Sequence, residues 1–88
     1  MLIDFTLAGG TFMKTVKISL NSIDKVKSFV NVISQFDSDF DLISGRYVID
    51  AKSIMGIFSL DLAQPIDLTI HADNDDEIMK ALDTYLVK

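Results

Sequence analysis

The most telling segment of this chain is residues 52–60, which read Lys52-Ser53-Ile54-Met55-Gly56-Ile57-Phe58-Ser59-Leu60. Ser53 stands directly before a short apolar run that can form one or two helical turns, so it is placed to cap a helix. Backbone N–H groups and the positive dipole end at a helix start also favour a phosphate group there. The segment predicts a short helix that runs to about Leu60 and is preceded by a candidate phosphorylation site at Ser53, although capping alone also explains a serine at this position.

The residues before this segment predict a strand followed by a helix. Residues 15–20 alternate polar and apolar side chains, which is the period of a half-buried strand. Asn21 or Ser22 can then cap a helix that runs to about residue 36, because apolar residues recur at three- and four-residue spacing. Those apolar residues are Val26, Phe29, Val30, Ile33 and Phe36.

The remaining elements complete the order β-α-β-β-α-β-α. Residues 40–43 and 46–50 read as strands joined by a tight turn at Ser44-Gly45, and residues 66–72 alternate as a last strand. A final helix carries an apolar face made of Ile78, Ala81, Leu82, Tyr85 and Leu86. This pattern predicts an α+β open-faced two-layer sandwich, with three helices on one face of a four-stranded antiparallel sheet. The open face is expected to be mostly polar and to carry Lys17, Ser19, Asp41, Asp67, Thr69 and His71.

Composition indicates a single domain and excludes several classes of function. The 88 residues are 49% apolar, with a mean hydropathy of +0.32, which is enough for a real core. The formal net charge of −5 argues against binding to nucleic acids or to anionic membranes. The chain has no cysteine and no apolar run long enough to span a membrane, which fits a cytoplasmic protein.

Residues 1–12 read as an extension before the domain. They lack the basic region of a signal peptide, and Asp4 interrupts their apolar stretch. Gly9-Gly10 could be encoded by codons that resemble a bacterial ribosome-binding site upstream of Met13. We therefore expect the domain to comprise residues 13–88, with Met13 as a candidate natural start. A genuine extra strand or arm is the alternative.

The segment around Ser53 resembles the regulatory-serine region of the histidine phosphocarrier (HPr) family of the sugar phosphotransferase system. The family pattern Ser-Ile-Met-Gly, followed by Ser-Leu and then Ala, is matched between Ser53 and Ala63. The segment that leaves the first helix of the family is also matched, at Phe36, Asp37, Asp39 and Leu42. The predicted element order is that of the HPr fold, and the resemblance extends over about residues 13–86.

The chain departs from the family where HPr proteins carry their phosphate. The family has Gly-Ile/Leu-His-Ala-Arg-Pro before its first helix, and the resemblance places Ser22 at the histidine and Asp24 at the arginine. Reversible transfer needs an imidazole nitrogen, whereas a serine phosphate ester is too stable for a relay. Asp24 would also repel a phosphate. The resemblance therefore implies a degenerate phosphocarrier site at Ser22 and Asp24, without the phosphoacceptor histidine.

The resemblance also implies that the chain keeps the regulatory serine of the family, at Ser53. Ser53 corresponds to the residue that HPr kinase/phosphorylase modifies, and Ile54, Met55 and Phe58 correspond to the apolar patch that HPr proteins present to partners. A Crh-like member of the family, which lacks the histidine and keeps the serine, is the nearest precedent. The implied partners are proteins, either HPr kinase/phosphorylase or a transcription regulator.

Three functions follow from these residues as alternatives. The leading one is a non-enzymatic regulatory protein-binding domain, controlled by phosphorylation of Ser53. The others are a divergent phosphocarrier that uses another acceptor such as Ser22, and a structural or dimerisation module. His71, the only histidine, is expected to be structural, and the acidic residues 73–77 lack the spacing of a calcium loop. We find no motif for a metal, a cofactor or an enzyme active site.

Overall fold

The computed structural model describes residues 13–72 and 75–87, and in them the elements follow the order predicted from the sequence. The strands are β2 (Met13–Ile18), β3 (Asp39–Ser44), β4 (Tyr47–Asp50) and β5 (Ile66–His71). The α-helices are α2 (Ile23–Ile33), α3 (Ile54–Ile57) and α4 (Asp76–Leu82), and a 3₁₀ helix, η1 (Asp83–Tyr85), follows α4. No α-helix in these two ranges is long and apolar enough to cross a membrane.

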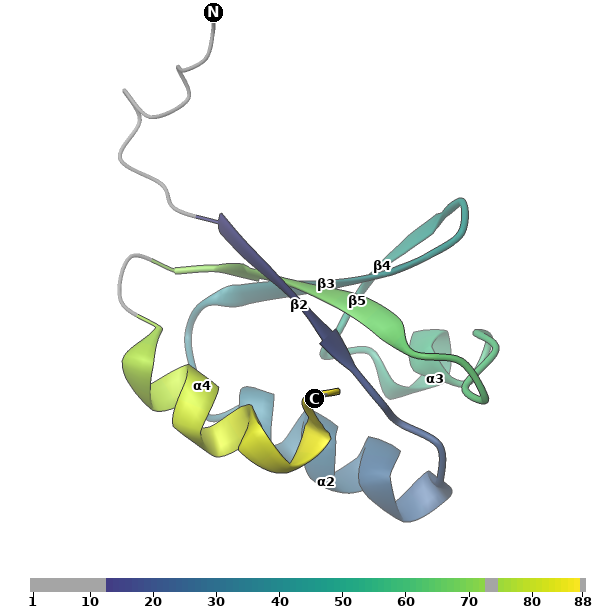
Figure 1. The fold of residues 1–88 in the computed structure, drawn as a ribbon, viewed down its shortest axis with the longest axis horizontal. Coiled ribbons are helices and arrows are strands. Elements are labelled where there is room, and N and C mark those ends of the chain that lie inside the picture. Colours follow the sequence, from purple (N-terminus) through teal and green to yellow (C-terminus); the bar gives the residue numbers. More distant parts are fainter. Residues whose placement is uncertain (1–12, 73–74, 88) are drawn as a thin grey trace, which may run out of the picture.

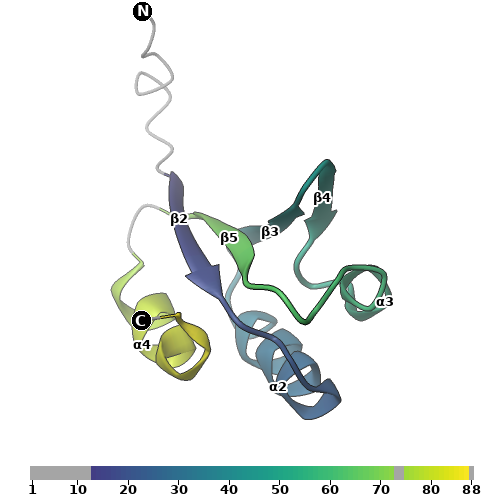
Figure 2. The same cartoon turned by 45° about the vertical axis from the view of Figure 1, so that its right-hand side comes forward.

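The four strands form one antiparallel sheet in the order β2-β5-β3-β4, so β5 lies between β2 and β3. The three α-helices lie on one face of this sheet (Figures 1 and 2). The predicted α+β open-faced sandwich is therefore confirmed. The first and last of the described strands are neighbours in the sheet, since β2 pairs with β5 from Met13↔His71 to Ile18↔Ile66.

The core lies between the sheet and the helices, where the predicted apolar faces meet. Helix α2 buries Val26, Phe29 and Ile33 completely, which is the three- and four-residue spacing of one helical face. Strand β5 buries every second residue against this layer, at Ile66, Leu68 and Ile70. Each such side chain contributes roughly 1.5–3 kcal/mol relative to an exposed one, so these faces determine the fold.

The opposite face of the sheet is polar, as predicted, and its side chains pair across the strands. These pairs are Thr15 with Thr69 (3.1 Å between hydroxyl oxygens), Lys17 with Asp67 (3.1 Å) and His71 with Asp41 (2.9 Å). Thr69 is only 7% exposed, which is more buried than the sequence suggested, because it lies on the inner strand β5. The Thr69 hydroxyl is hydrogen-bonded to the Thr15 hydroxyl, so burying it leaves no unpaired polar group and carries little cost in free energy.

The sequence prediction was wrong at the two ends of the domain. The first strand ends at Ile18 rather than Leu20, so Ser19 does not lie in the strand of the open face. The last helix ends at Leu82, and Leu86 forms a bridge with Ile18 instead of continuing the helix. Two backbone bonds explain both differences: Ser19 N–H donates to the Tyr85 carbonyl and Val87 N–H to the Lys17 carbonyl, each at 2.9 Å. The chain end thus covers part of the β2 edge.

Two helices are shorter than predicted, and the hairpin turn lies one residue later. Helix α2 ends at Ile33, and α3 is a single turn followed by bends to residue 60. The hairpin turns at Gly45-Arg46, and Gly45 has φ of +61°, a conformation that glycine adopts without strain. The extension predicted for residues 1–12 lies outside the described residues, so the start at Met13 stays a prediction.

Candidate functional site

Ser22 caps the N-terminus of α2. Of the two predicted capping residues, Asn21 and Ser22, the structure therefore uses Ser22. Its hydroxyl oxygen accepts a hydrogen bond from Lys25 N–H at 3.1 Å, and its backbone is extended. Ser22 is exposed, and Asp24 lies in the first turn of the helix. A carboxylate at this position suits the helix dipole but opposes the approach of an anionic phosphoryl donor.

Ile23 adds an exposed apolar side chain to the same helix start, with 63% of its surface accessible. The surroundings of Ser22 are therefore an apolar residue and a carboxylate, and the nearest lysine offers Ser22 its backbone N–H. Among the described residues, no carboxylate or imidazole is hydrogen-bonded to the Ser22 hydroxyl to act as a general base. The geometry supports helix capping by Ser22.

His71 lies at the far end of the sheet from Ser22. Strand pairing sets His71 opposite Met13, whereas Ile18, which leads into α2, pairs with Ile66. Five residues of antiparallel strand separate the two ends, or roughly 17 Å. The Nε2 atom of His71 lies 2.9 Å from the Asp41 carboxylate, so one ring nitrogen is already engaged. The only histidine of the chain is thus not brought to the start of the first helix.

Ser53 caps the start of α3 in the same way. Its hydroxyl oxygen accepts a hydrogen bond from Gly56 N–H at 3.3 Å, and its carbonyl accepts one from Ile57 N–H at 3.0 Å. The Ser53 side chain is exposed. A Cβ atom on Gly56 would come within 3.2 Å of the Ser53 hydroxyl and 3.3 Å of the Ile49 side chain. Glycine therefore lets this turn pack closely on β4 and keeps the serine hydroxyl at the helix start.

The apolar residues of α3 divide between the core and the surface. Ile57 is fully buried, and Ile54 is half-buried and packs against the core. Met55 and Phe58, by contrast, have 78% and 41% of their surface exposed. The predicted patch of Ile54, Met55 and Phe58 thus presents two of its three side chains to solvent. Their position next to Ser53 places an exposed serine hydroxyl beside exposed apolar surface.

Lys52 is a residue of this site that the sequence pattern did not single out. Its ammonium group donates to the Phe36 carbonyl at 2.7 Å and lies 5.6 Å from the centre of the Phe40 ring. Lys52 therefore ties the segment before α3 to the loop after α2, and a lysine next to a serine gives no sequence signal for such a contact. The ammonium group of Lys52 therefore points toward Phe36 and Phe40, and no hydrogen bond among the described residues joins it to the Ser53 hydroxyl.

Residues 24–87 match a family model described as "PTS HPr component phosphorylation site". The chain belongs to the HPr family. Proteins of this family are phosphocarriers that work with other proteins of the phosphotransferase system. The matched region begins at Asp24, two residues after Ser22, so it contains all of α2 except Ile23, the segment around Ser53 and the C-terminal helix.

Solved structures of HPr proteins share this fold. The phosphocarrier protein HPr from Bacillus anthracis is 28% identical, with a TM-score of 0.65 over 88% of this chain and 98% of that one. HPr-C-His from Thermoanaerobacter tengcongensis is also 28% identical, with a TM-score of 0.62 over 83% and 88% of the two chains. The histidine-containing phosphocarrier protein of Mycoplasma is 22% identical, with a TM-score of 0.61, over 88% and 99%, and shows the fold alone.

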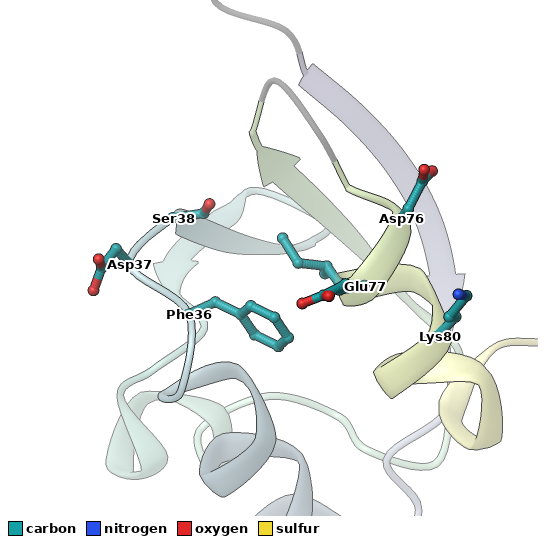
Figure 3. Close-up of a pocket in the computed structure, with 7 residues that line it drawn as sticks. Phe36, Asp37, Ser38, Asp76, Glu77 and Lys80 are labelled. Carbon is teal, nitrogen blue, oxygen red and sulfur yellow. The ribbon is translucent and has the colours of Figure 1, made fainter.

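A separate pocket of about 440 Å³ lies between the loop after α2 and the start of α4 (Figure 3). In Figure 3, Phe36 and Glu77 point toward each other, whereas Asp37 and Asp76 point away from the hollow. The carboxylates therefore do not converge on one point. Among the described residues, no group of three histidine, cysteine or acidic side chains could hold a metal ion. Ser22 and Ser53 do not line this pocket of the HPr domain.

Replacing Ser53 with alanine should lower the free energy of unfolding by about 1 kcal/mol, because the Gly56 N–H loses its side-chain acceptor. Urea denaturation followed by circular dichroism measures this change. Ser53→Asp is the matched variant, since a carboxylate can accept the same bond and should keep most of the stability. Equal losses in the two variants would show that capping does not determine the stability at this position.

Proposed function

We propose that this HPr-family domain is a regulatory protein-binding domain, controlled by phosphorylation of Ser53, and that it does not relay phosphate by the usual route of the family. The observation that carries the proposal is the contrast between two helix starts. The start of α2 offers Ser22 and Asp24 where the family resemblance places a histidine and an arginine. The start of α3 offers an exposed serine beside Met55 and Phe58.

Phosphorylation of Ser53 fits the local electrostatics. A phosphate adds a charge of about −1.5 to −2 and three strong acceptor oxygens. Because α3 is one turn long, its dipole is small, and the main partners of the phosphate would be the N–H groups of this turn. Gly56 N–H already points toward the Ser53 oxygen at 3.3 Å. The modification therefore changes the charge beside the exposed patch without requiring α3 to unfold.

The partners of such a surface are proteins, and we propose an HPr kinase/phosphorylase or a transcription regulator of the cytoplasm. Met55 is the most exposed large apolar residue of the described chain, and adaptable methionine side chains suit a docking surface. A phosphate at Ser53 would strengthen binding to a basic partner and weaken binding to an acidic or purely apolar one. The proposed role needs no metal, cofactor or enzymatic activity of the domain itself.

The proposal is tested by incubation with an HPr kinase/phosphorylase and ATP, followed by intact-mass analysis. We expect one phosphate on the wild-type protein and none on Ser53→Ala. Ser59→Ala is the matched control, because Ser59 is another exposed serine of the same segment and should leave the modification unchanged. An unmodified wild-type mass, in a reaction that modifies a serine-containing HPr protein, would contradict regulation at Ser53.

The role of the patch is separated from that of the hydroxyl with Met55→Asp. Met55 is 78% exposed, so this substitution should change the free energy of unfolding by less than about 0.5 kcal/mol. If the patch docks the kinase, the variant is phosphorylated more slowly although Ser53 is intact. An unchanged phosphorylation rate in Met55→Asp would show that Met55 does not dock the kinase, and only the proposal on Ser53 would stand.

A second candidate is a divergent phosphocarrier that uses Ser22 as its acceptor. It is favoured by one observation: Ser22 is exposed at the positive end of an 11-residue helix, which is a suitable place for a phosphate. Against it stands the stability of the phosphate ester and the carboxylate of Asp24. The two functions differ in whether phosphoenolpyruvate can label the protein through Enzyme I.

A further inference from the structure

Strand β4 forms one edge of the sheet, and its outer side carries no strand in the part of the chain that the structure describes. The opposite edge, β2, is partly covered, because residues 85–87 bond to the backbone of residues 17–19. The hairpin of β3 and β4 also projects away from the helices (Figure 1). An uncovered edge of this kind is a template for pairing with another strand.

The pairing of β4 with β3 determines which backbone groups remain at that edge. Ala51 N–H donates to the Phe40 carbonyl at 2.9 Å, and Leu42 pairs with Ile49 two residues further along. Because bonded and non-bonded pairs alternate along an antiparallel ladder, Tyr47 and Ile49 turn their backbone groups toward β3. Val48 therefore turns its N–H and carbonyl outward, to the free edge.

The residues around Val48 are complementary to a second copy of themselves. When two such strands run antiparallel and are centred on Val48, each Arg46 lies opposite Asp50 of the other copy. Arg46 precedes the strand and Asp50 ends it, so the two charges flank the valine pair on the same face. On the other face Tyr47 lies opposite Ile49 of the second copy.

We propose that the outer edge of β4 associates with β4 of a second copy of this chain, in the register that pairs Val48 with Val48 and Arg46 with Asp50. The two Val48 residues exchange two backbone hydrogen bonds, and the symmetric contact joins two four-stranded sheets into one. Such an isologous interface closes after two copies and does not continue as a fibre.

The side chains at this edge are available for the contact. Tyr47 and Val48 have 69% and 63% of their surface exposed, and tyrosine and arginine are enriched at protein interfaces. Arg46 is the only arginine of the chain, it is exposed, and it makes no ion pair with a described residue. Asp50 accepts one bond from Lys52 N–H at 2.9 Å through Oδ1, which leaves Oδ2 for a guanidinium.

Sedimentation velocity over a range of protein concentrations tests this association. Because the strand is four residues long, we expect a weak dimer with a dissociation constant on the order of 100 μM. Arg46→Asp or Asp50→Arg alone should each weaken the dimer by about tenfold or more, since like charges then face each other twice. A monomer at every concentration up to about 1 mM would overturn the proposal.

Mixing the two charge variants tests the register itself. In the mixed dimer the introduced carboxylate faces the introduced guanidinium, and the unchanged Arg46 and Asp50 face each other, so the affinity of the wild type should return. Lys27→Asp is the control, because it makes the same charge change at an exposed position on α2 and should leave the dimer intact. Failure of the mixture to restore association would rule out this register.

A cross-link gives a second readout that does not depend on charge. Two Val48→Cys copies should form a disulfide under oxidising conditions, because residues of a hydrogen-bonded pair have Cα atoms about 5.5 Å apart, within the range of a disulfide. The chain has no other cysteine, so the product is unambiguous. Met55→Cys, also exposed, is the control and should cross-link much more slowly. Equal rates for both variants would contradict pairing through β4.

Discussion

Incubation with Enzyme I and labelled phosphoenolpyruvate should leave this protein without acid-labile phosphate, under conditions that fully label a histidine-containing HPr protein. We expect labelling to be slower by several orders of magnitude, because general acid–base and nucleophilic groups contribute factors of about 10²–10⁴ each. Ser22 has no base hydrogen-bonded to its hydroxyl among the described residues, the Asp24 carboxylate would repel an anionic donor, and His71 lies at the far end of the sheet. The label is followed by gel autoradiography before and after mild acid treatment.

Variants identify the acceptor if any label is seen. A phosphoserine at Ser22 is stable to acid and is abolished in Ser22→Ala, whereas a phosphohistidine at His71 is acid-labile and is abolished in His71→Gln. Rapid acid-labile labelling of the wild type would contradict the proposed loss of the relay. Such a result would favour a divergent phosphocarrier and leave the phosphorylation of Ser53 as a separate question.

The order of the elements could be predicted because each element has one apolar face. The spacing of Val26, Phe29 and Ile33 indicates a helix against a sheet, and all three are fully buried. The alternation of Ile66, Leu68 and Ile70 indicates a strand with one buried face, and these residues form the inner side of β5. The spacing of apolar residues predicts the type of element because a helix buries every third or fourth residue and a half-buried strand every second one.

The ends of the elements could not be predicted in the same way. Leu86 continues the apolar spacing of α4, but the chain leaves the helical path after Tyr85, and Leu86 bridges to Ile18 of β2 instead. The backbone bonds from Ser19 N–H to the Tyr85 carbonyl and from Val87 N–H to the Lys17 carbonyl hold it there. Such bonds join residues more than sixty positions apart, and no local pattern contains them. The same limit applies to the contact of Lys52 with the Phe36 carbonyl.

At the candidate site, the sequence predicted the two capping serines, and both have the expected hydrogen bonds. It could not divide the apolar residues of α3, because a single helical turn is too short for a clear face. The structure places Ile54 against the core and leaves Met55 and Phe58 exposed. Whether these two residues bind a partner stays a proposal.

Phe29→Ala should be the most destabilising single substitution in this protein, with a loss of about 3–5 kcal/mol. Phe29 is fully buried on α2, and its ring meets Tyr85 edge to face with 5.6 Å between ring centres. The Tyr85 hydroxyl in turn bonds to Ser28, so the removal of the ring loosens the contact between α2 and the chain end. A domain of this size has a free energy of unfolding of roughly 4–13 kcal/mol, so Phe29→Ala would remove a large part of its stability.

The matched control for this prediction is Phe58→Ala, which removes the same atoms from a residue that is 41% exposed. We expect a loss of no more than about 1.5 kcal/mol there, because less surface leaves contact with protein and no closed cavity forms. Thermal unfolding followed by circular dichroism measures both variants, and Phe29→Ala should lower the melting temperature by at least about 12 °C. If Phe58→Ala cost as much as Phe29→Ala, Phe58 would belong to the core. A small loss for Phe58→Ala would instead show that the fold does not need this side chain, which leaves it free to contact a partner.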